Sequence, residues 1–144
     1  ATPVDVVSVV RDVLALEQLG VSDVEWTLDV PSGDGPVLGL AQPDELKEVL
    51  LNLLENARLA QARLVHVSVR VASDGVAVDV RDDGQGIAAD VLPQVFEPHF
   101  STRTSGSGLG LAISRRLLEG WGGRIALEST VGIGTVVHVI LRTA

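Results

Sequence analysis

The stretch from Leu64 to Asp82 reads LVHVSVRVASDGVAVDVRD, and it decides the fold. Apolar and polar residues alternate on both sides of Ser73-Asp74-Gly75, which is typical of two β-strands joined by a tight turn. This hairpin predicts a sheet with one apolar face. The residues expected on that face are Val65, Val67, Val69, Val71, Val76, Val78 and Val80.

Three other segments have the period of amphipathic helices. They cover residues 4–19, a segment that begins near Pro43, and residues 109–119 before Gly120. Further strands are predicted over residues 24–30, 124–128 and 135–142. This order predicts a single domain over residues 1–144, with one antiparallel or mixed sheet and helices on a single face. The apolar helix positions are Val6, Val7, Val10, Val13, Leu14 and Leu16 in the first helix, and Leu46, Val49, Leu50, Leu53, Leu54, Ala57 and Ala60 in the second.

Composition excludes several classes of function. Of the 144 residues 46% are apolar, enough for one packed core. The chain has no cysteine, which excludes disulfides, thiolate metal sites and cysteine nucleophiles. A net charge of −8 without a basic stripe argues against nucleic-acid binding. No apolar run reaches the ~20 residues of a membrane span and no signal-peptide pattern opens the chain, so we expect no direct membrane contact.

Asp82 continues the alternation of Val76, Val78 and Val80, so its carboxylate is expected on the buried face. A buried carboxylate is unfavourable unless it is hydrogen-bonded or paired. Two interpretations follow from the residue alone. Asp82 caps the turn that follows, or it accepts a hydrogen bond from the exocyclic amine of a bound base. The second would favour adenine, because guanine presents a carbonyl oxygen at that position.

Glycines and asparagines on either side of the hairpin suggest a ligand site. Gly84 and Gly86 follow Asp82, and glycine lets a flat ring approach the backbone without a Cβ in the way. Asn52 and Asn56 are four residues apart and so share one face of the second helix. They are solvated residues beside the apolar stripe, or the Asn56 amide oxygen binds Mg²⁺, which needs few protein ligands when phosphates supply the others.

The segment from Ser105 to Leu111 reads SGSGLGL at the start of the third helix. Successive backbone N–H groups and the helix dipole make such a segment an anion site, which an acidic protein can still offer to a polyphosphate. It is not a P-loop, because no Gly-Lys-Ser or Gly-Lys-Thr follows.

In their order along the chain, these clusters resemble the signatures of histidine-kinase ATPase domains, from about Val4 to Leu141. The family has a Bergerat-type ATP-binding fold, an α/β two-layer sandwich with about three helices on one face of a mixed, mostly antiparallel sheet. The matching motifs are Asn52-x-x-x-Asn56-Ala, Asp82-x-Gly84-x-Gly86-Ile87, Phe96-Glu97-Pro98-His99-Phe100, Gly106-Ser107-Gly108-Leu109-Gly110-Leu111 and Gly132-x-Gly134-Thr135.

The resemblance implies ATP and Mg²⁺ as ligands. Asn56 would hold Mg²⁺, Asp82 the adenine amine, and Thr135 would place a hydroxyl near that aspartate. Arg103 lies in a short lid, similar to that of nitrogen-regulation sensor kinases, and matches the basic position that reaches the γ-phosphate; no residue is assigned as catalytic beyond this. The other residues of the implied nucleotide site are Asn52, Gly84, Gly86, Ile87, Phe100, Ser105, Gly106, Ser107, Gly108, Leu109, Gly110 and Leu111.

Two positions depart from the family pattern. Many members have a lysine and then an aromatic residue shortly after the Mg²⁺ asparagine, where this chain has Leu59 and Ala60. Phosphate contacts from this helix would therefore need Arg58 or Arg63. Asp83 replaces the usual asparagine, which adds charge without removing the contact expected of Asp82.

The implied function is transfer of the ATP γ-phosphoryl group to a histidine on a separate dimerisation domain of the same parent protein, with a response regulator downstream. The parent is expected in the cytoplasm or anchored to its membrane. His66, His99 and His138 are not followed by an acidic residue and lie outside the predicted helices, so none is expected to be the acceptor.

Three alternatives remain open. ATPases of the gyrase, mismatch-repair and chaperone group carry a glutamate one turn before the Mg²⁺ asparagine; this chain has Asn52, and an amide cannot act as a general base. An anti-sigma-factor serine kinase has a related fold, but Phe96-Glu97-Pro98 argues against it. The third alternative is a nucleotide-sensing module without catalysis.

Overall fold

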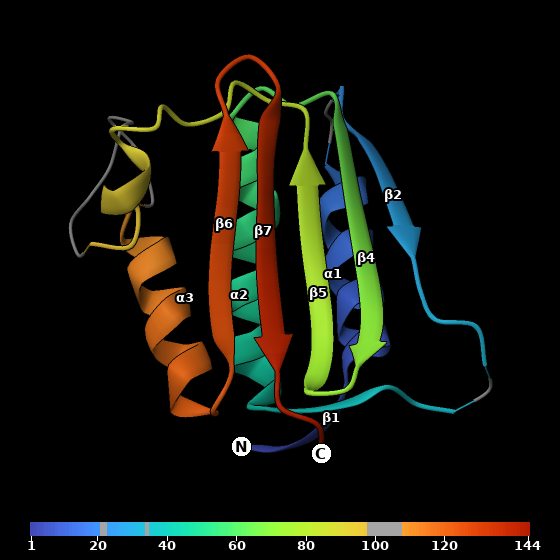
Figure 1. The fold of residues 1–144 in the computed structure, drawn as a ribbon. Coiled ribbons are helices and arrows are strands. Elements are labelled where there is room, and N and C mark those ends of the chain that lie inside the picture. Colours follow the sequence, from blue (N-terminus) through green and yellow to red (C-terminus); the bar gives the residue numbers. More distant parts are fainter. Residues whose placement is uncertain (21–22, 34, 98–107) are drawn as a thin grey trace.

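The computed structural model describes residues 1–20, 23–33, 35–97 and 108–144. Three helices cover one face of a five-stranded sheet, and the described part of the chain leaves the other face uncovered (Figure 1). The helices are α1 (Val6–Leu19), α2 (Pro43–Leu59) and α3 (Gly108–Gly120), and a short 3-10 turn, η1, spans Leu92–Gln94. The strands, in sheet order, are β2 (Glu25–Asp29), β4 (Leu64–Ala72), β5 (Gly75–Asp82), β7 (Gly134–Leu141) and β6 (Arg124–Thr130).

This arrangement confirms the predicted two-layer sandwich. Strand β2 runs parallel to β4, and the other neighbouring pairs are antiparallel, so the sheet is mixed and mostly antiparallel. None of the helices in the described ranges is long and apolar enough to cross a bilayer.

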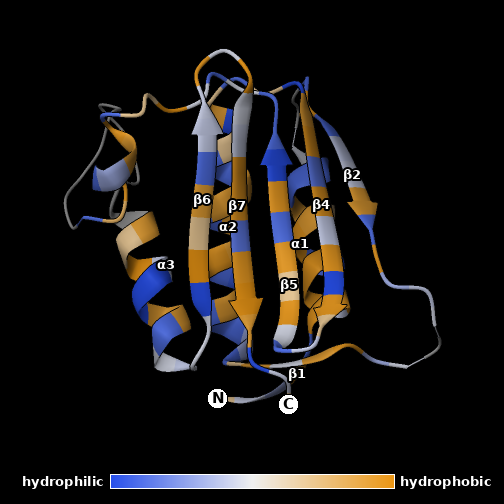
Figure 2. Cartoon of the chain, in the orientation of Figure 1, coloured by the Kyte–Doolittle hydropathy of each residue, from blue (hydrophilic) through white to orange (hydrophobic). Residues whose placement is uncertain are grey.

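The predicted hairpin forms β4 and β5 at the centre of the sheet, and their hydropathy alternates along each strand (Figure 2). Val67 lies opposite Val80, and both are buried against the helices. Val71 is the exception to the predicted buried face, since it is 63% exposed. The parallel neighbour β2 pairs with β4 only as far as Ser68, so Val71 lies in the part of β4 that β2 does not flank.

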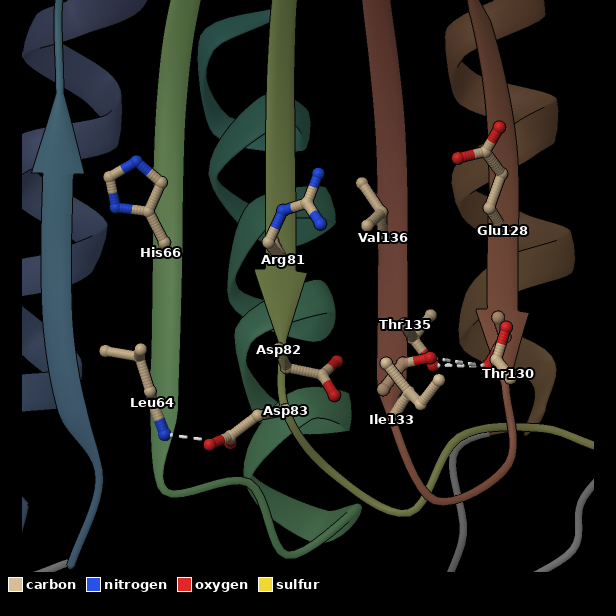
Figure 3. A pocket seen from close by; sticks show the side chains of 12 residues that line it. Leu64, His66, Arg81, Asp82, Asp83, Glu128, Thr130, Ile133, Thr135 and Val136 are labelled. Carbon is tan, nitrogen blue, oxygen red and sulfur yellow. Dashed lines mark hydrogen bonds between the residues drawn. The ribbon is translucent and has the colours of Figure 1, made fainter.

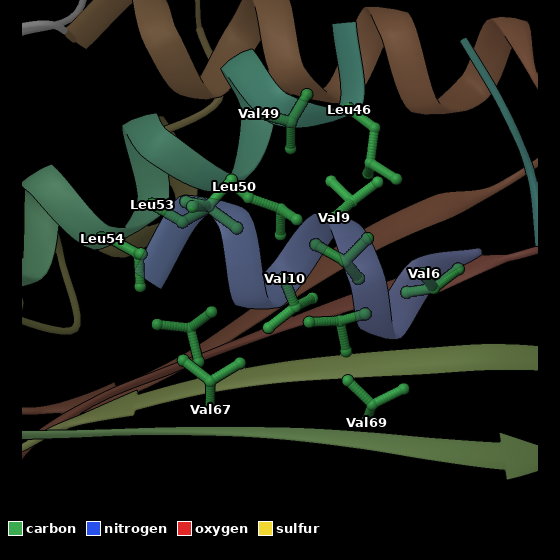
Figure 4. Close-up of a cluster of buried hydrophobic side chains, with 14 of the residues drawn as sticks. Val6, Val9, Val10, Leu46, Val49, Leu50, Leu53, Leu54, Val67 and Val69 are labelled. Atoms are coloured by element: carbon green, nitrogen blue, oxygen red, sulfur yellow. The ribbon is translucent and has the colours of Figure 1, made fainter. Parts of the chain in front are cut away.

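Helix α1 lies beside α2 on the same face of the sheet, and its valines face both the leucines of α2 and the valines of β4 (Figure 4). It begins at Val6 rather than Val4, because Asp5 caps it by accepting the Ser8 N–H. The prediction that Leu16 belongs to its apolar face is wrong. Leu16 is 54% exposed, and the face includes Val9 instead. The buried residues of α1 are Val6, Val9, Val10, Val13 and Leu14.

Helix α2 follows its predicted pattern. Gln42 caps it by accepting the Glu45 N–H at 2.7 Å, and Pro43 occupies its first turn, where a missing N–H has no consequence. Its buried residues are the predicted Leu46, Val49, Leu50, Leu53, Leu54 and Ala57, while Ala60 is only half-buried. Each fully buried leucine or valine stabilises the core by about 1.5–3 kcal/mol.

Two short strands were not predicted from the sequence. β1 (Thr2–Asp5) and β3 (Leu38–Ala41) pair with each other, and the Arg142 carbonyl accepts the Leu40 N–H at 2.9 Å. They lie at the end of the sandwich where the two termini meet (Figure 1). The loop after β5 and the turn between β6 and β7 lie together at the opposite end (Figure 1). Asp82, the last residue of β5, is at this end.

Candidate functional site

Asp82 is the last residue of β5 and is 9% exposed. It lies opposite Val65 in β4 and opposite Thr135 in β7, so its side chain is on the helix-covered face, as its alternation predicted. Gly84 donates its backbone N–H to Asp82 Oδ1 at 2.8 Å, which bears out the turn-capping interpretation. A carboxylate offers about four lone-pair sites, so this bond leaves capacity for a donor on a ligand.

Burial dominates the ionisation of Asp82. Desolvation raises the pKa of this carboxyl, backbone hydrogen bonds from Gly84 and Thr135 lower it, and the neighbouring charge of Asp83 raises it again. The net effect is a pKa above the ordinary value. A carboxylate in such a position binds a hydrogen-bond donor strongly, because little water competes for it.

The loop after Asp82 is held between α2 and the turn that joins β6 to β7. A Cβ on Gly84 would lie 2.6 Å from the Ala60 carbonyl oxygen, and a Cβ on Gly86 would lie 2.2 Å from the Thr130 carbonyl oxygen. Gly86 also has a φ of 76°, which favours glycine. In the structure, the absence of a Cβ at these positions therefore serves the packing of protein backbone against protein backbone.

Asp83 has a structural role that the sequence did not reveal. Its Oδ1 accepts the N–H groups of Arg63 and Leu64 at 2.8 and 2.9 Å, which ties the loop to the start of β4. The hydrogen bonds from Leu64 and then Arg63 lower the pKa of Asp83. The departure from the family asparagine thus supplies an ionised acceptor for this turn, on the exposed side of the loop.

Asn52 and Asn56 lie on α2 in the turns that lead to Ala60. The Ala60 carbonyl accepts the Gln85 N–H at 2.9 Å, so the end of α2 contacts the glycine loop directly. The spacing of four residues from Asn52 to Asn56 and from Asn56 to Ala60 places all three on one face, and both asparagines are half-buried. Asn52 Nδ2 is a buried donor for which the described residues provide no acceptor. Groups with unsatisfied donors and acceptors of this kind are typical of sites that bind a ligand or water.

The described residues fit a Mg²⁺ site in which the protein supplies few ligands and phosphates supply the others, as the sequence suggested. In the described ranges, no three His, Asp or Glu side chains are close enough to hold a metal. A metal site built from three or more of these side chains is therefore absent from that part of the chain. A single amide oxygen from Asn56, completed by phosphate oxygens and water, is compatible with the preference of Mg²⁺ for oxygen ligands.

Most of the predicted phosphate site lies outside the described residues. This holds for Phe100, Arg103, Ser105, Gly106 and Ser107. Gly108, Leu109 and Gly110 form the first turn of α3, and Leu111 is half-buried against the hydrophobic core. The start of the aromatic motif is described: Phe96 stacks under the Arg115 guanidinium of α3, 5.5 Å from the ring centroid.

A hollow of about 360 Å³ opens at this end of the sheet (Figure 3). Asp82, Ser129 and Thr135 line it from the helix-covered face. The open face contributes Leu64, His66, Arg81, Glu128, Thr130 and Val136, and the neighbouring loops contribute Asp83, Ile133 and Gly134. Most of the lining therefore belongs to the open face and the loops, and of the lining residues only Asp82 and Thr135 belong to the predicted nucleotide site.

Comparison with known proteins agrees with this geometry. Residues 41–144 match the family model described as histidine kinase-, DNA gyrase B- and HSP90-like ATPase, and the chain belongs to that family. Within the family it is similar to sensor histidine kinases. It is 46% identical over 99 residues to the sensor histidine kinase ZraS of Klebsiella oxytoca, an alignment that covers 67% of this chain and 21% of ZraS.

Two solved structures share the whole fold. The mycobacterial sensor histidine kinase MprB superposes with a TM-score of 0.85 at 27% identity, covering 99% of this chain and 98% of that one. The catalytic domain of histidine kinase ThkA gives 0.84 at 27% identity, covering 99% and 95%. The recognition of a sensor histidine kinase ATP-binding domain is therefore confirmed. This chain spans about a fifth of the length of the curated relatives it matches.

Proposed function

We propose that this chain binds ATP together with Mg²⁺ and presents the γ-phosphoryl group to a histidine on a separate helical domain of the same parent protein. The observation that carries the proposal is the environment of Asp82. Its carboxylate is buried at the end of β5, fixed by Gly84 and adjacent to Thr135. Such an acceptor suits the exocyclic amine of adenine, and sensor histidine kinases are the relatives of this chain.

The proposed reaction is an in-line displacement. A ring nitrogen of the acceptor histidine forms a bond to the γ-phosphorus while the bond from that phosphorus to the β–γ bridging oxygen breaks, and ADP leaves. The described residues contribute position: Asp82 and the Gly84–Ile87 loop orient the base, and α2 presents Asn56 toward the phosphates. Arg103 is proposed to neutralise charge on the γ-phosphate.

Magnesium would be held by the Asn56 amide oxygen and by phosphate oxygens. It would supply neutralisation of the polyphosphate charge. Asn52, one turn earlier, has a buried Nδ2 without an acceptor among the described side chains and is therefore proposed to donate to a bound water or to the nucleotide.

Hydrolysis by this chain alone is proposed to be slow. The gyrase-type alternative needs a general base one turn before the Mg²⁺ ligand, and the amide of Asn52 cannot take a proton from water. A slow hydrolase preserves the phosphoryl group for the acceptor domain. Phosphoryl transfer to a downstream response regulator is proposed from the same relatives.

The direct test of the metal assignment is calorimetric titration of a non-hydrolysable ATP analogue with and without Mg²⁺. Asn56→Ala should reduce the Mg²⁺-dependent part of the affinity and leave the fold intact, since Asn56 lies beside the apolar stripe and its truncation opens no core cavity. Asp44→Ala, in the first turn of the same helix, is the control. An unchanged response to Mg²⁺ in Asn56→Ala would assign the metal to another residue.

A further inference from the structure

Ser129, near the end of β6, belongs to none of the family motifs, yet it lies at the centre of a hydrogen-bond cluster. Its Oγ accepts the Ile87 N–H at 2.7 Å. It also lies 3.1 Å from the Gly134 carbonyl oxygen and 2.7 Å from Thr135 Oγ1. These contacts join β6 to β7 and to the loop that follows Asp82, across 42 residues of sequence.

Sheet register connects the same residue to the site. Ser129 lies opposite Thr135, and Thr135 lies opposite Asp82. Directly opposed residues of antiparallel strands share a face, so the three side chains form one row on the helix-covered side. Asp82 and Thr135 are buried in this row, and Ser129 is half-buried.

Proton counting indicates what Ser129 can do. A serine hydroxyl has one proton and two lone pairs. The Ile87 N–H occupies one lone pair. All three contacts are satisfied together when the Thr135 hydroxyl donates to the second lone pair and Ser129 donates to the Gly134 carbonyl. The capacity of the hydroxyl is then filled within the protein, so Ser129 acts on a ligand through its neighbours.

The neighbours are the residues expected to surround the base. Gly132 donates its N–H to the Gln85 carbonyl at 2.9 Å, and Gly86 packs against the Thr130 carbonyl. The Ser129 hydroxyl is thus the side-chain member of a clamp that is otherwise made of backbone. Loss of this hydroxyl would free the Ile87 end of the loop and the Thr135 hydroxyl while leaving the β6–β7 ladder in place.

We propose that Ser129 is a positioning residue for base selection, which holds the Gly84–Ile87 loop and Thr135 in register with Asp82. The inference rests on the proposed function, because base selection presupposes nucleotide binding. Its signature is a change in the preference for ATP over inosine triphosphate, whose purine carries a carbonyl oxygen in place of the exocyclic amine.

The test measures the Kd values of both nucleotides by calorimetry with the full chain and its Ser129→Ala and Ser129→Thr variants. A loss equivalent to one hydrogen bond, worth ~0.5–1.5 kcal/mol, predicts that Ser129→Ala lowers the ATP preference about 2- to 13-fold. An inactive fraction of the protein would lower the number of binding sites found for both nucleotides equally, so it would not change the ratio of the two Kd values. Ser129→Thr keeps the hydroxyl and should restore most of the preference.

Ser68→Ala is the matched control, since it removes a hydroxyl from β4 on the open face of the same sheet and should leave the ratio unchanged. If Ser129→Ala keeps the parent ratio, the positioning role is overturned while ATP binding stands. The same conclusion follows if Ser129→Thr shows no recovery in a folded protein. Absence of ATP binding by the parent chain would instead overturn the proposed function.

Discussion

Gly84 donates its backbone N–H to the carboxylate of Asp82 at 2.8 Å. Such a hydrogen bond lowers a carboxyl pKa, yet the pKa of Asp82 lies above its ordinary value. Desolvation therefore exceeds the stabilisation that the backbone hydrogen bonds provide. A buried carboxylate that is costly to ionise lowers the stability of the ligand-free fold. It becomes favourable when a ligand brings a donor, which is the behaviour expected of a binding residue rather than of a turn cap alone.

Replacing Asp82 with Asn should weaken ATP binding. The amide oxygen can still accept the Gly84 N–H, but the charge-assisted hydrogen bond proposed between the Asp82 carboxylate and the adenine amine would be lost. A bond of this kind is worth ~1.5–3 kcal/mol, so the affinity for ATP should fall about 10- to 150-fold in a calorimetric titration. Equal affinities of the parent chain for ATP and GTP would contradict the role of Asp82 in selecting adenine.

The same substitution should stabilise the ligand-free domain at neutral pH. The pKa of Asp82 is higher in the folded than in the unfolded chain, so its contribution is present below the unfolded value of about 4 and is lost as the pH rises through the folded value. The melting temperature of Asp82→Asn should therefore exceed that of the parent at pH 7, and the difference should shrink toward pH 4. A lower melting temperature for Asp82→Asn at pH 7 would show that the ionised carboxylate is net stabilising.

Gly84→Ala should disturb both the fold and the site. Its Cβ would lie 2.6 Å from the Ala60 carbonyl oxygen and 2.9 Å from Asp82 Oδ1, so the loop must move. Overpacking of this kind typically costs about 1–3 kcal/mol, measurable by urea denaturation. Gly120→Ala, at the end of α3, has no heavy atom within 4 Å of its Cβ and should cost little. Equal stabilities of the two variants would contradict the described packing of the loop.

A separate cluster of hydrogen-bonded side chains lies on the open face of the sheet. Asp79 accepts hydrogen bonds from Arg70 at 2.8 Å and from His138 Nδ1 at 2.7 Å, while His138 Nε2 lies 3.5 Å from Glu128. Burial raises the pKa of Asp79, but the hydrogen bonds and charges of His138 and Arg70 together lower it by more. The pKa of Asp79 is therefore below its ordinary value. The ionised carboxylate therefore stabilises the fold.

Asp79→Asn should cost about 1–2 kcal/mol at pH 7, less than the ~3 kcal/mol upper value for charged hydrogen bonds because Arg70 is mostly exposed. Because the folded pKa is depressed, the contribution is present above the unfolded value and is lost as the pH falls through the folded one. Urea denaturation of parent and variant at pH 7 and at successively lower pH should show the difference decreasing. Asp29→Asn, at the exposed end of β2, is the control. A difference that is constant with pH would contradict an ionised Asp79.

The sequence predicted the parts of this molecule that repeat with a regular period. The alternation of β4 and β5 placed Asp82 on the buried face, and the leucines of α2 placed Asn52 and Asn56 beside the stripe. The four-residue strands β1 and β3 were not predicted because neither is long enough to show a period. They also pair with each other across α1 and β2, and such a long-range pairing leaves no local sequence pattern. Val9 rather than Leu16 completes α1 because a short valine-rich helix allows more than one apolar face.

Roles that depend on tertiary contacts were also missed. Asp83 was expected only to add charge, but it accepts two backbone N–H groups from the start of β4. Ser129 differs from any other polar residue near a strand end only through contacts with Ile87 and Thr135. The sequence offered one indication of this role. Ser129 follows Ile125 and Leu127 at every second position of β6, which places a serine on the helix-covered face.

Transfer of a radiolabelled γ-phosphoryl group tests the central claim most directly. The chain is incubated with labelled ATP and Mg²⁺, first alone and then with the helical histidine domain of its parent protein. Alone, it should neither label itself nor release phosphate at a useful rate. With the added domain it should produce an acid-labile phosphohistidine there, and this should fail with Asn56→Ala and weaken with Arg103→Ala. Rapid phosphate release by the chain alone, or an acid-stable phosphoserine on a partner, would contradict the account.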